Sequence, residues 1–241
     1  MNTNDFEILL ESILTENNLQ MHLRKDSLSK LTLFYRKLIE VNAHTNLTAI
    51  TEPGEIVLKH FSDCVTLAGI IPQNATLIDV GCGGGFPSIP LAIARPDLKI
   101  TALDSTAKKI SFVKSVAELA GLCNVDAVCA RAEEYAQIKR ESFDACASRA
   151  VARLNILAEL CLPLIKKNGM FCAMKSISAA EELEESKPAT DKLGGIFKES
   201  MNYELKHNNE CVNRTILIFE KVGKTPGQYP RKFNQIKKNP L

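Results

Sequence analysis

One segment constrains the fold of this chain more than any other: the apolar run at residues 77–80 passes directly into a cluster of glycines. This order predicts a buried strand, a tight turn and the start of a helix. Gly81, Gly83 and Gly85 let the backbone turn sharply and let a ligand lie against it, while the helix N-terminus offers unpaired N–H groups. We expect a nucleotide-like cofactor at this loop, the alternative being a glycine-rich turn without a ligand.

After residue 75, short β-rich runs alternate with helical patterns, as in βαβ units with a mostly parallel sheet. The last two strands are expected to close the sheet as a hairpin-like edge. The expected strands are 77–80, 99–103, 125–129, 143–147, 170–174, 197–205 and 213–221, and the expected helices between them are 87–94, 107–121, 132–138, 154–165 and 177–186.

The first seventy residues differ, because their apolar side chains repeat at helical spacing in three stretches. We therefore expect a helical extension at 1–72, whose apolar stripes are packing faces, before a Rossmann-like domain at 73–222. A basic tail follows at 223–241. Six basic residues and no acidic one lie between Lys221 and Leu241, so the tail could meet phosphate, or it could simply be solvated.

The third glycine of the loop distinguishes two cofactors. A dinucleotide fingerprint requires glycine at position 86, where this chain has Phe86, and the Gly-x-Gly-x-Gly spacing is typical of S-adenosylmethionine-dependent methyltransferases. Asp104 ends the second strand, where a carboxylate can accept hydrogen bonds from both ribose hydroxyls. Glu133 follows the third strand and could accept from an adenine amine, or could merely cap a helix. The sequence therefore predicts an α/β, Rossmann-like class I S-adenosylmethionine-dependent methyltransferase, with a mostly parallel seven-stranded sheet and an N-terminal helical extension.

Two common methyl-transfer mechanisms lack their motifs in this sequence. There is no Pro-Cys dipeptide for a cysteine nucleophile and no Asp/Asn-Pro-Pro-Tyr/Phe run for an exocyclic amine. A target with an unprotonated lone pair, such as guanine N7, needs neither a nucleophile nor a general base. Positioning that lone pair in line with the sulfonium methyl, and excluding water, would be the whole task.

Composition excludes several other classes. With 45% hydrophobic and 24% charged residues the chain resembles an ordinary globular protein, and its uncharged runs are shorter than the roughly 20 residues of a membrane span. No signal-peptide pattern is visible, so we expect a cytoplasmic protein. The eight cysteines form no Cys-x-x-Cys pair, which favours buried free thiols over disulfides and predicts no metal site.

Motifs spread over residues 42–241 add a more specific signal. They are Asn42-x-x-x-Asn46-Leu-Thr, Lys59-His60-Phe-x-Asp63, Asp79-Val-Gly-x-Gly-x-Gly-Phe-Pro-x-Ile-Pro90, Lys108-Lys109, Arg131-Ala-Glu133, Phe143-Asp-x-x-x-Ser-Arg-Ala-Val151 and Tyr229-Pro-Arg-Lys232. Together they resemble the small-subunit ribosomal RNA methyltransferase G family, formerly called glucose-inhibited division protein B. The Phe-Pro-x-Ile-Pro extension and the Ser-Arg-Ala-Val segment are not general methyltransferase features. Ser88 stands where this family usually has glycine.

The resemblance implies methylation of guanine N7 in 16S ribosomal RNA of the small subunit, with S-adenosyl-L-methionine as methyl donor. Arg149 could pair with the methionine carboxylate or with an RNA phosphate, the alternative being a surface ion pair at the start of a helix. By position in the motifs, the cofactor-binding residues would be Gly81, Gly83, Gly85, Phe86, Asp104, Ala132, Glu133 and Arg149, with Gly83 and Gly85 shaping the loop and Asp104 on the ribose.

No catalytic residue is assigned, because a positioning mechanism needs no general base; Arg149 and Lys175 are the candidates. A basic rim and salt-sensitive binding are expected of an RNA enzyme. His60 and Asp63, three residues apart on one helical face, could support the site or the joint between the domains, and a structural pair is the favoured interpretation. We expect a monomer. The RNA-binding candidates are Arg153, Lys175, Arg231 and Lys232.

Two alternatives stay open at this point. A methyltransferase acting on a small molecule or a protein would have a closed apolar pocket in place of the basic rim. A non-catalytic module that holds immature small subunits during assembly would bind the cofactor tightly without methylating any RNA.

Overall fold

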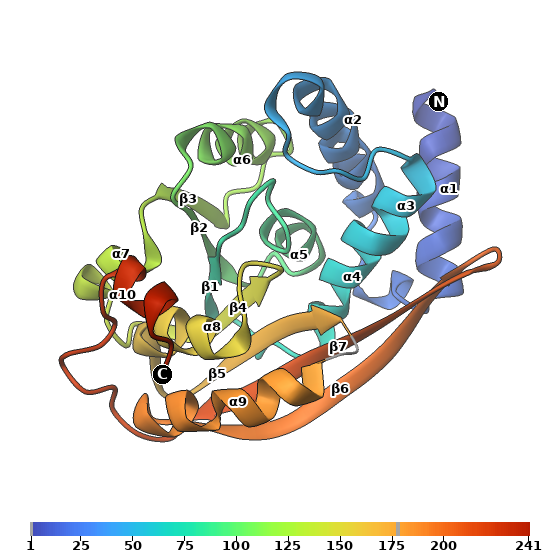
Figure 1. Ribbon diagram of the computed structural model, residues 1–241. Helices are drawn as coiled ribbons and strands as arrows, with labels where there is room; N and C mark the ends of the chain where they lie inside the picture. Colours follow the sequence, from blue (N-terminus) through green and yellow to red (C-terminus); the bar gives the residue numbers. More distant parts are fainter. Residues whose placement is uncertain (1, 177–178) are drawn as a thin grey trace.

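The computed structural model describes residues 2–176 and 179–241, and a seven-stranded sheet with the order β3-β2-β1-β4-β5-β7-β6 runs through its centre (Figure 1). Strands β1 to β5 are parallel, and β7 runs antiparallel to both β5 and β6. The predicted fold class and hairpin edge are confirmed. The strands are β1 (Thr76–Val80), β2 (Lys99–Asp104), β3 (Val125–Cys129), β4 (Phe143–Arg149), β5 (Ile165–Ser176), β6 (Gly195–His207) and β7 (Glu210–Lys221).

Helices cover both faces of the sheet and form two apolar cores with it. Alternate residues of β1 enter different cores, as the pleat requires: Leu77 packs on one side and Ile78 on the other. The first core includes α1 (Thr3–Glu16), α2 (Ser27–Thr45), α3 (Pro53–Ile56), α4 (Asp63–Val65), α5 (Ser88–Ala94) and α6 (Ala107–Leu119). The second includes α7 (Ala132–Ile138), α8 (Leu154–Cys161), α9 (Ala179–Lys192) and α10 (Phe233–Lys238).

Two predicted helix boundaries are wrong. The helix expected at 154–165 ends at Cys161, because a 3-10 turn containing Pro163 follows and Ile165 already pairs with β4. The helix expected at 177–186 begins at positions outside the described residues, and α9 continues beyond it to Lys192, passing through Pro188. Ala189, a buried residue of that last part, packs in the second core and explains why the helix continues.

The N-terminal helices share their core with the sheet. Phe34 of α2 lies 5.3 Å from Phe61, 5.1 Å from Phe86 and 6.2 Å from Phe112, measured between ring centroids. The β6–β7 hairpin reaches past the sheet to the end of α1 (Figure 1), where Asn17 exchanges two hydrogen bonds with the backbone of residue 206. The division at residue 72 thus stays a prediction, and no break in packing marks it.

Five of the eight cysteines are buried and all are free; Cys123, Cys129 and Cys211 are exposed, so the expectation of buried thiols is wrong for these three. Within residues 2–176 and 179–241, no helix is long and apolar enough to cross a membrane. No group of His, Cys, Asp or Glu side chains in these ranges could hold a metal ion.

Candidate active site

A cavity of about 460 Å³ opens at the carboxyl ends of β1, β2 and β4. The strand order reverses here, since β1 lies between β2 and β4, and open α/β sheets bind ligands at such a point. Its volume lies within the range of small-molecule sites. Seven of the eight residues predicted to bind the cofactor line it, Gly85 being the exception: Gly81, Gly83, Phe86, Asp104, Ala132, Glu133 and Arg149.

The loop needs glycine at positions 81 and 85, because each has a positive φ and has no room for a Cβ atom. Gly81 has φ +79°, and a Cβ there would lie 2.4 Å from a methyl carbon of Val151. Gly85 has φ +88°, and a Cβ there would lie 2.8 Å from Ile89. Leu103 fixes the loop to β2, because its carbonyl accepts hydrogen bonds from the first two N–H groups of the loop at 2.8 and 3.0 Å. Side chains at these positions would therefore fill or distort the concave backbone of residues 81–85, which we call the cradle.

Asp104 is held rigidly at the mouth of this loop. Its Oδ2 accepts a hydrogen bond from the Gly83 N–H at 3.0 Å, and its Oδ1 accepts one from the Thr106 N–H at 2.8 Å. Lys109 Nζ lies 3.9 Å from Oδ2. Each carboxylate oxygen has a second lone pair, so the group can still accept from a pair of ribose hydroxyls.

Arg149, at the end of β4, enters the cavity paired with Asp63, a carboxylate that also lies 3.7 Å from Arg214 Nε. Arg149 Nη1 donates to Asp63 Oδ2 and to the Lys59 carbonyl, both at 3.1 Å, and its Nη2 donates to His60 Nδ1 at 3.1 Å. The guanidinium carbon lies 5.1 Å from the centroid of the Phe86 ring. His60 and Asp63 do not pair with each other: they lie in or next to a π-helical turn, Val57–Ser62, and both bind Arg149. They therefore support the site, the alternative to a structural pair.

His60 is neutral in this site. Burial, together with the charge of Arg149, lowers the pKa of His60 to about 3. Its Nε2 lies 2.8 Å from Thr48 Oγ1, and its Nδ1 lies 3.1 Å from both Arg149 Nη2 and the Lys59 carbonyl oxygen. Because arginine can only donate, a hydrogen bond from Arg149 to Nδ1 requires the tautomer with its proton on Nε2. The imidazole lies 4.6 Å from the Phe86 ring. This wall of the cavity is therefore aromatic and uncharged.

The loop that carries Thr48 is built by Asn42. The Asn42 side-chain oxygen accepts from the N–H groups of Leu47 and Thr48 at 2.6 and 2.9 Å, and its amide nitrogen donates to the Thr48 carbonyl at 2.9 Å. Asn46 takes a left-handed conformation, with φ +49°. Leu47 and Thr48 consequently line the cavity. The motif Asn42-x-x-x-Asn46-Leu-Thr was recognised in the sequence, but nothing in it indicated that it would form a wall of this cavity.

Two buried carboxylates, Asp79 and Asp63, lie behind the cavity, and only Asp63 was considered from the sequence as a support of the site. Asp79 accepts from the Ser88 N–H at 3.1 Å and from Ser88 Oγ at 2.5 Å, so the serine hydroxyl gives this buried carboxylate a second donor. Burial raises the pKa of Asp79 to about 7. Asp63, besides binding Arg149, accepts from the Tyr203 hydroxyl of β6 at 2.6 Å. Burial also raises the pKa of Tyr203 well above its usual range, so this hydroxyl remains a donor.

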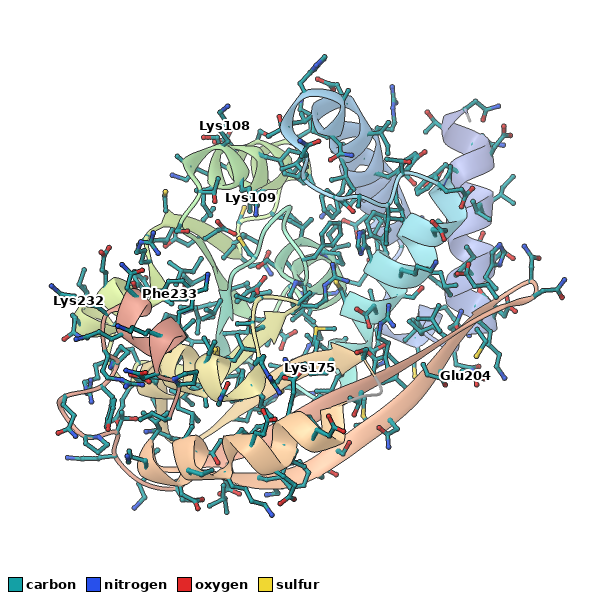
Figure 2. The ribbon with its side chains drawn as sticks, in the orientation of Figure 1. Lys108, Lys109, Lys175, Glu204, Lys232 and Phe233 are labelled. Carbon is teal, nitrogen blue, oxygen red and sulfur yellow. The ribbon has the colours of Figure 1, made fainter. Side chains whose placement is uncertain are left out.

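None of the four RNA-binding candidates lines the cavity, and three of them, Arg153, Lys175 and Arg231, are engaged in ion pairs. Arg153 pairs with Glu185 at 2.5 Å. Lys175 Nζ donates to Glu182 at 2.7 Å and to the carbonyl of residue 152, with a side chain only 10% exposed (labelled in Figure 2). Lys175, one of the two catalytic candidates, therefore does not line the cavity.

The C-terminal segment is packed against the domain, contrary to a freely solvated tail. Arg231 donates to Glu159, a fully buried residue, through Nε at 2.9 Å, Nη2 at 2.6 Å and its backbone N–H at 2.8 Å. Lys221 is also buried, and desolvation lowers its pKa. Lys232 is exposed and has no ion pair among the described residues. Lys221 is thus too deeply buried to contact RNA at the surface, and Arg231 mainly fixes the C-terminal segment to Glu159.

The chain is similar to known proteins over almost its entire length. Residues 27–212 match the sequence model of the family described as GidB, rRNA small subunit methyltransferase G. A protein of Lactobacillus acidophilus named ribosomal RNA small subunit methyltransferase G is 42% identical over 99% of each chain. Proteins of the same name from Oceanobacillus iheyensis and Bacillus subtilis are 44% and 43% identical, over 92% and 89% of this chain and 94% and 90% of theirs.

Solved structures share the fold at low sequence identity. M. jannaschii TYW2 in complex with AdoMet matches with a TM-score of 0.56 and 17% identity, covering 68% of this chain and 76% of that one. A precorrin-6y C5,15-methyltransferase from Geobacter metallireducens matches with a TM-score of 0.52 and 16% identity, covering 66% and 87%. These structures support the methyltransferase-type sheet and say nothing about the substrate.

Proposed function

We propose that this chain, which belongs to the ribosomal RNA small subunit methyltransferase G family, transfers a methyl group from S-adenosyl-L-methionine to N7 of a guanine in 16S ribosomal RNA. The observation that carries the proposal is 42% identity to a curated member over 99% of the chain. The cavity supports it, because the residues matching the family motifs converge there from β1, β2 and β4.

The cavity fits the methyl donor. S-adenosyl-L-methionine supplies an electrophilic methyl group on a sulfonium. The cradle at Gly81, which a Cβ would block, and the fixed carboxylate of Asp104 suit a nucleoside with free ribose hydroxyls. In our assignment Ala132 and Glu133 hold the adenine, and Arg149 holds the methionine carboxylate.

The residues facing the target base have to position it, exclude water and tolerate a cationic product. Guanine N7 carries its own lone pair, so no side chain has to remove a proton. Phe86 and the neutral His60 form an apolar wall suited to a planar base. Arg149 is paired with Asp63, and the field of an unpaired cation beside the methylated base is thereby reduced.

The remaining features follow from the same assignment. The partner is the RNA of the small ribosomal subunit, the site of action is the cytoplasm, where ribosomes are assembled, and the enzyme works as a monomer. The helical extension at 1–72, the methyltransferase domain at 73–222 and the tail at 223–241 are the units we assign.

Transfer of labelled methyl groups tests the proposal. The purified protein is incubated with labelled S-adenosylmethionine and either 30S subunits or protein-free 16S RNA from a strain that lacks it. We expect incorporation into one or both substrates, and its loss in Asp104→Ala. Cofactor binding without incorporation into either RNA would favour a non-catalytic assembly factor, and incorporation into a small molecule or protein would overturn the RNA assignment.

A further inference from the structure

A second hollow, of about 520 Å³, adjoins the first cavity, and the same three residues, Arg131, Glu133 and Phe233, line both. It lies between α7 and α10, and Figure 2 shows Lys232 and Phe233 at the start of α10, beside α7. The remaining lining residues come from the same two segments: Glu134, Gln137, Pro230, Arg231, Lys232 and Asn234.

The walls of this hollow are fixed in place. Arg231 is anchored by three hydrogen bonds to the buried Glu159 of α8. Arg140 donates to the carbonyl oxygens of Thr225 and Tyr229 at 2.6 and 2.7 Å, holding the preceding segment. Since Ile236, in the middle of α10, is also completely buried, the helix is held at its start and along its length, and the hollow is a built feature of the fold.

Its chemistry is that of a nucleotide site. Phe233 offers an aromatic face, and the guanidinium carbon of Arg131 lies 5.8 Å from its centroid; unpaired bases stack on both kinds of plane. Neither Arg131 nor Lys232 has an ion pair in the part of the chain that the structure describes, so both charges are available to phosphate. Glu134, which lines only the second hollow, adds an acceptor for amino groups on a base edge.

We propose that this hollow receives an unpaired nucleotide of the RNA substrate close in sequence to the methylated guanine. Its base stacks on Phe233, and its phosphate lies near Lys232. The inference rests on the proposed function, and it identifies where the RNA chain leaves the active site. RNA fits better than the cofactor because Lys232 lines only the second hollow, and a phosphodiester needs a cation where an adenine does not.

Binding to protein-free 16S RNA, measured over a range of salt concentrations with S-adenosylhomocysteine present, tests this site. Phe233→Leu keeps an apolar side chain without a stacking plane and should weaken RNA binding about tenfold, the effect of losing one base stack. Phe233→Tyr keeps the plane and should bind as the wild type does. The logarithm of the RNA-binding constant falls linearly with the logarithm of the salt concentration, and Lys232→Gln should make this negative slope shallower by about 0.7 to 0.9. Lys237 is exposed on the same helix but lies outside the hollow, so Lys237→Gln is the matched control and should change the salt dependence less than Lys232→Gln does.

Calorimetry with S-adenosylhomocysteine, and thermal unfolding of each variant, complete the test. We expect cofactor affinity within about twofold of wild type in every variant. If Phe233→Leu weakens cofactor binding and leaves RNA binding unchanged, the residue is a wall of the cofactor cavity and the inference is wrong. Equal losses in Lys232→Gln and Lys237→Gln would also overturn it. Wild-type protein that binds the RNA without methylating it would refute the proposed function alone, because the binding comparison can still be made.

Discussion

Replacing Asp79 by asparagine should change how the stability of this protein depends on pH. The carboxyl group is completely buried; its Oδ2 accepts two hydrogen bonds from Ser88, while its Oδ1 has no partner among the described residues. Burial raises the pKa of Asp79 to about 7, although Ser88 and Arg149 oppose this shift, whereas the ordinary value is 3.8. Asp79→Asn keeps the shape of the side chain and removes the titration.

The sign follows from proton binding. Because the folded pKa lies above the unfolded one, the folded protein binds more protons between these values, and its free energy of unfolding falls as pH rises through about 7. Integrating this linkage from pH 5 to pH 8 gives a loss of about 2.5 kcal/mol from Asp79. His60 acts oppositely, because its folded pKa of about 3 lies below the unfolded value and its contribution is lost as pH falls. His60 is present in both proteins, so its contribution cancels when the free energy of unfolding of the wild type is subtracted from that of the variant.

Urea unfolding followed by far-ultraviolet circular dichroism suits this chain, which has no tryptophan. Measured at four pH values from 5 to 8, the variant should gain about 2.5 kcal/mol relative to wild type as pH rises. Its absolute stability depends also on the new amide hydrogen atoms, which lack an acceptor, but that cost does not vary with pH. A difference that stays constant across this range would refute the reasoning, and so would a variant whose stability relative to wild type falls as pH rises.

Three further substitutions test other parts of the site. Gly81→Ala should lower affinity for S-adenosylhomocysteine at least about tenfold in calorimetry, while Gly121→Ala, also at positive φ but with nothing within 4 Å, should leave it unchanged; equal effects would contradict the cradle. Glu159→Ala should lower the free energy of unfolding by about 3 kcal/mol, because Arg231 then lacks its carboxylate, and a loss below about 1 kcal/mol in urea unfolding would contradict that pairing. Asp104→Ala should weaken S-adenosylhomocysteine binding at least about tenfold and leave RNA affinity unchanged, and calorimetry beside an RNA-binding assay would expose the opposite pattern.

The sheet was predictable because each strand has a local pattern of its own. Apolar runs flanked by turn residues place β1 to β4 within two residues of where they lie. The glycine loop was predictable for the same reason, since a tight turn at positive φ leaves a direct mark in the sequence. Proline at position 188 gave the opposite signal, and the helix continues through it because tertiary packing outweighs local propensity.

Pairings between distant segments left no such mark. Asp63 binds Arg149 across 86 positions of the chain, and the three-residue spacing to His60 suggested a different partner for it. Arg231 looked like a surface charge in a basic tail, whereas its partner, Glu159, lies 72 positions away in the core. Charge alone does not distinguish an exposed arginine from one that pairs inside a fold, and only the folded topology supplies the partner.

Nucleoside mass spectrometry tests the central claim most directly. 16S RNA from a strain lacking the protein, free or in 30S subunits, is digested before and after incubation with the protein and S-adenosylmethionine. The account predicts that 7-methylguanosine appears only in the incubated sample and is lost with Asp104→Ala. A methyl group on another nucleoside, or no new methylated nucleoside while the cofactor still binds, would contradict it.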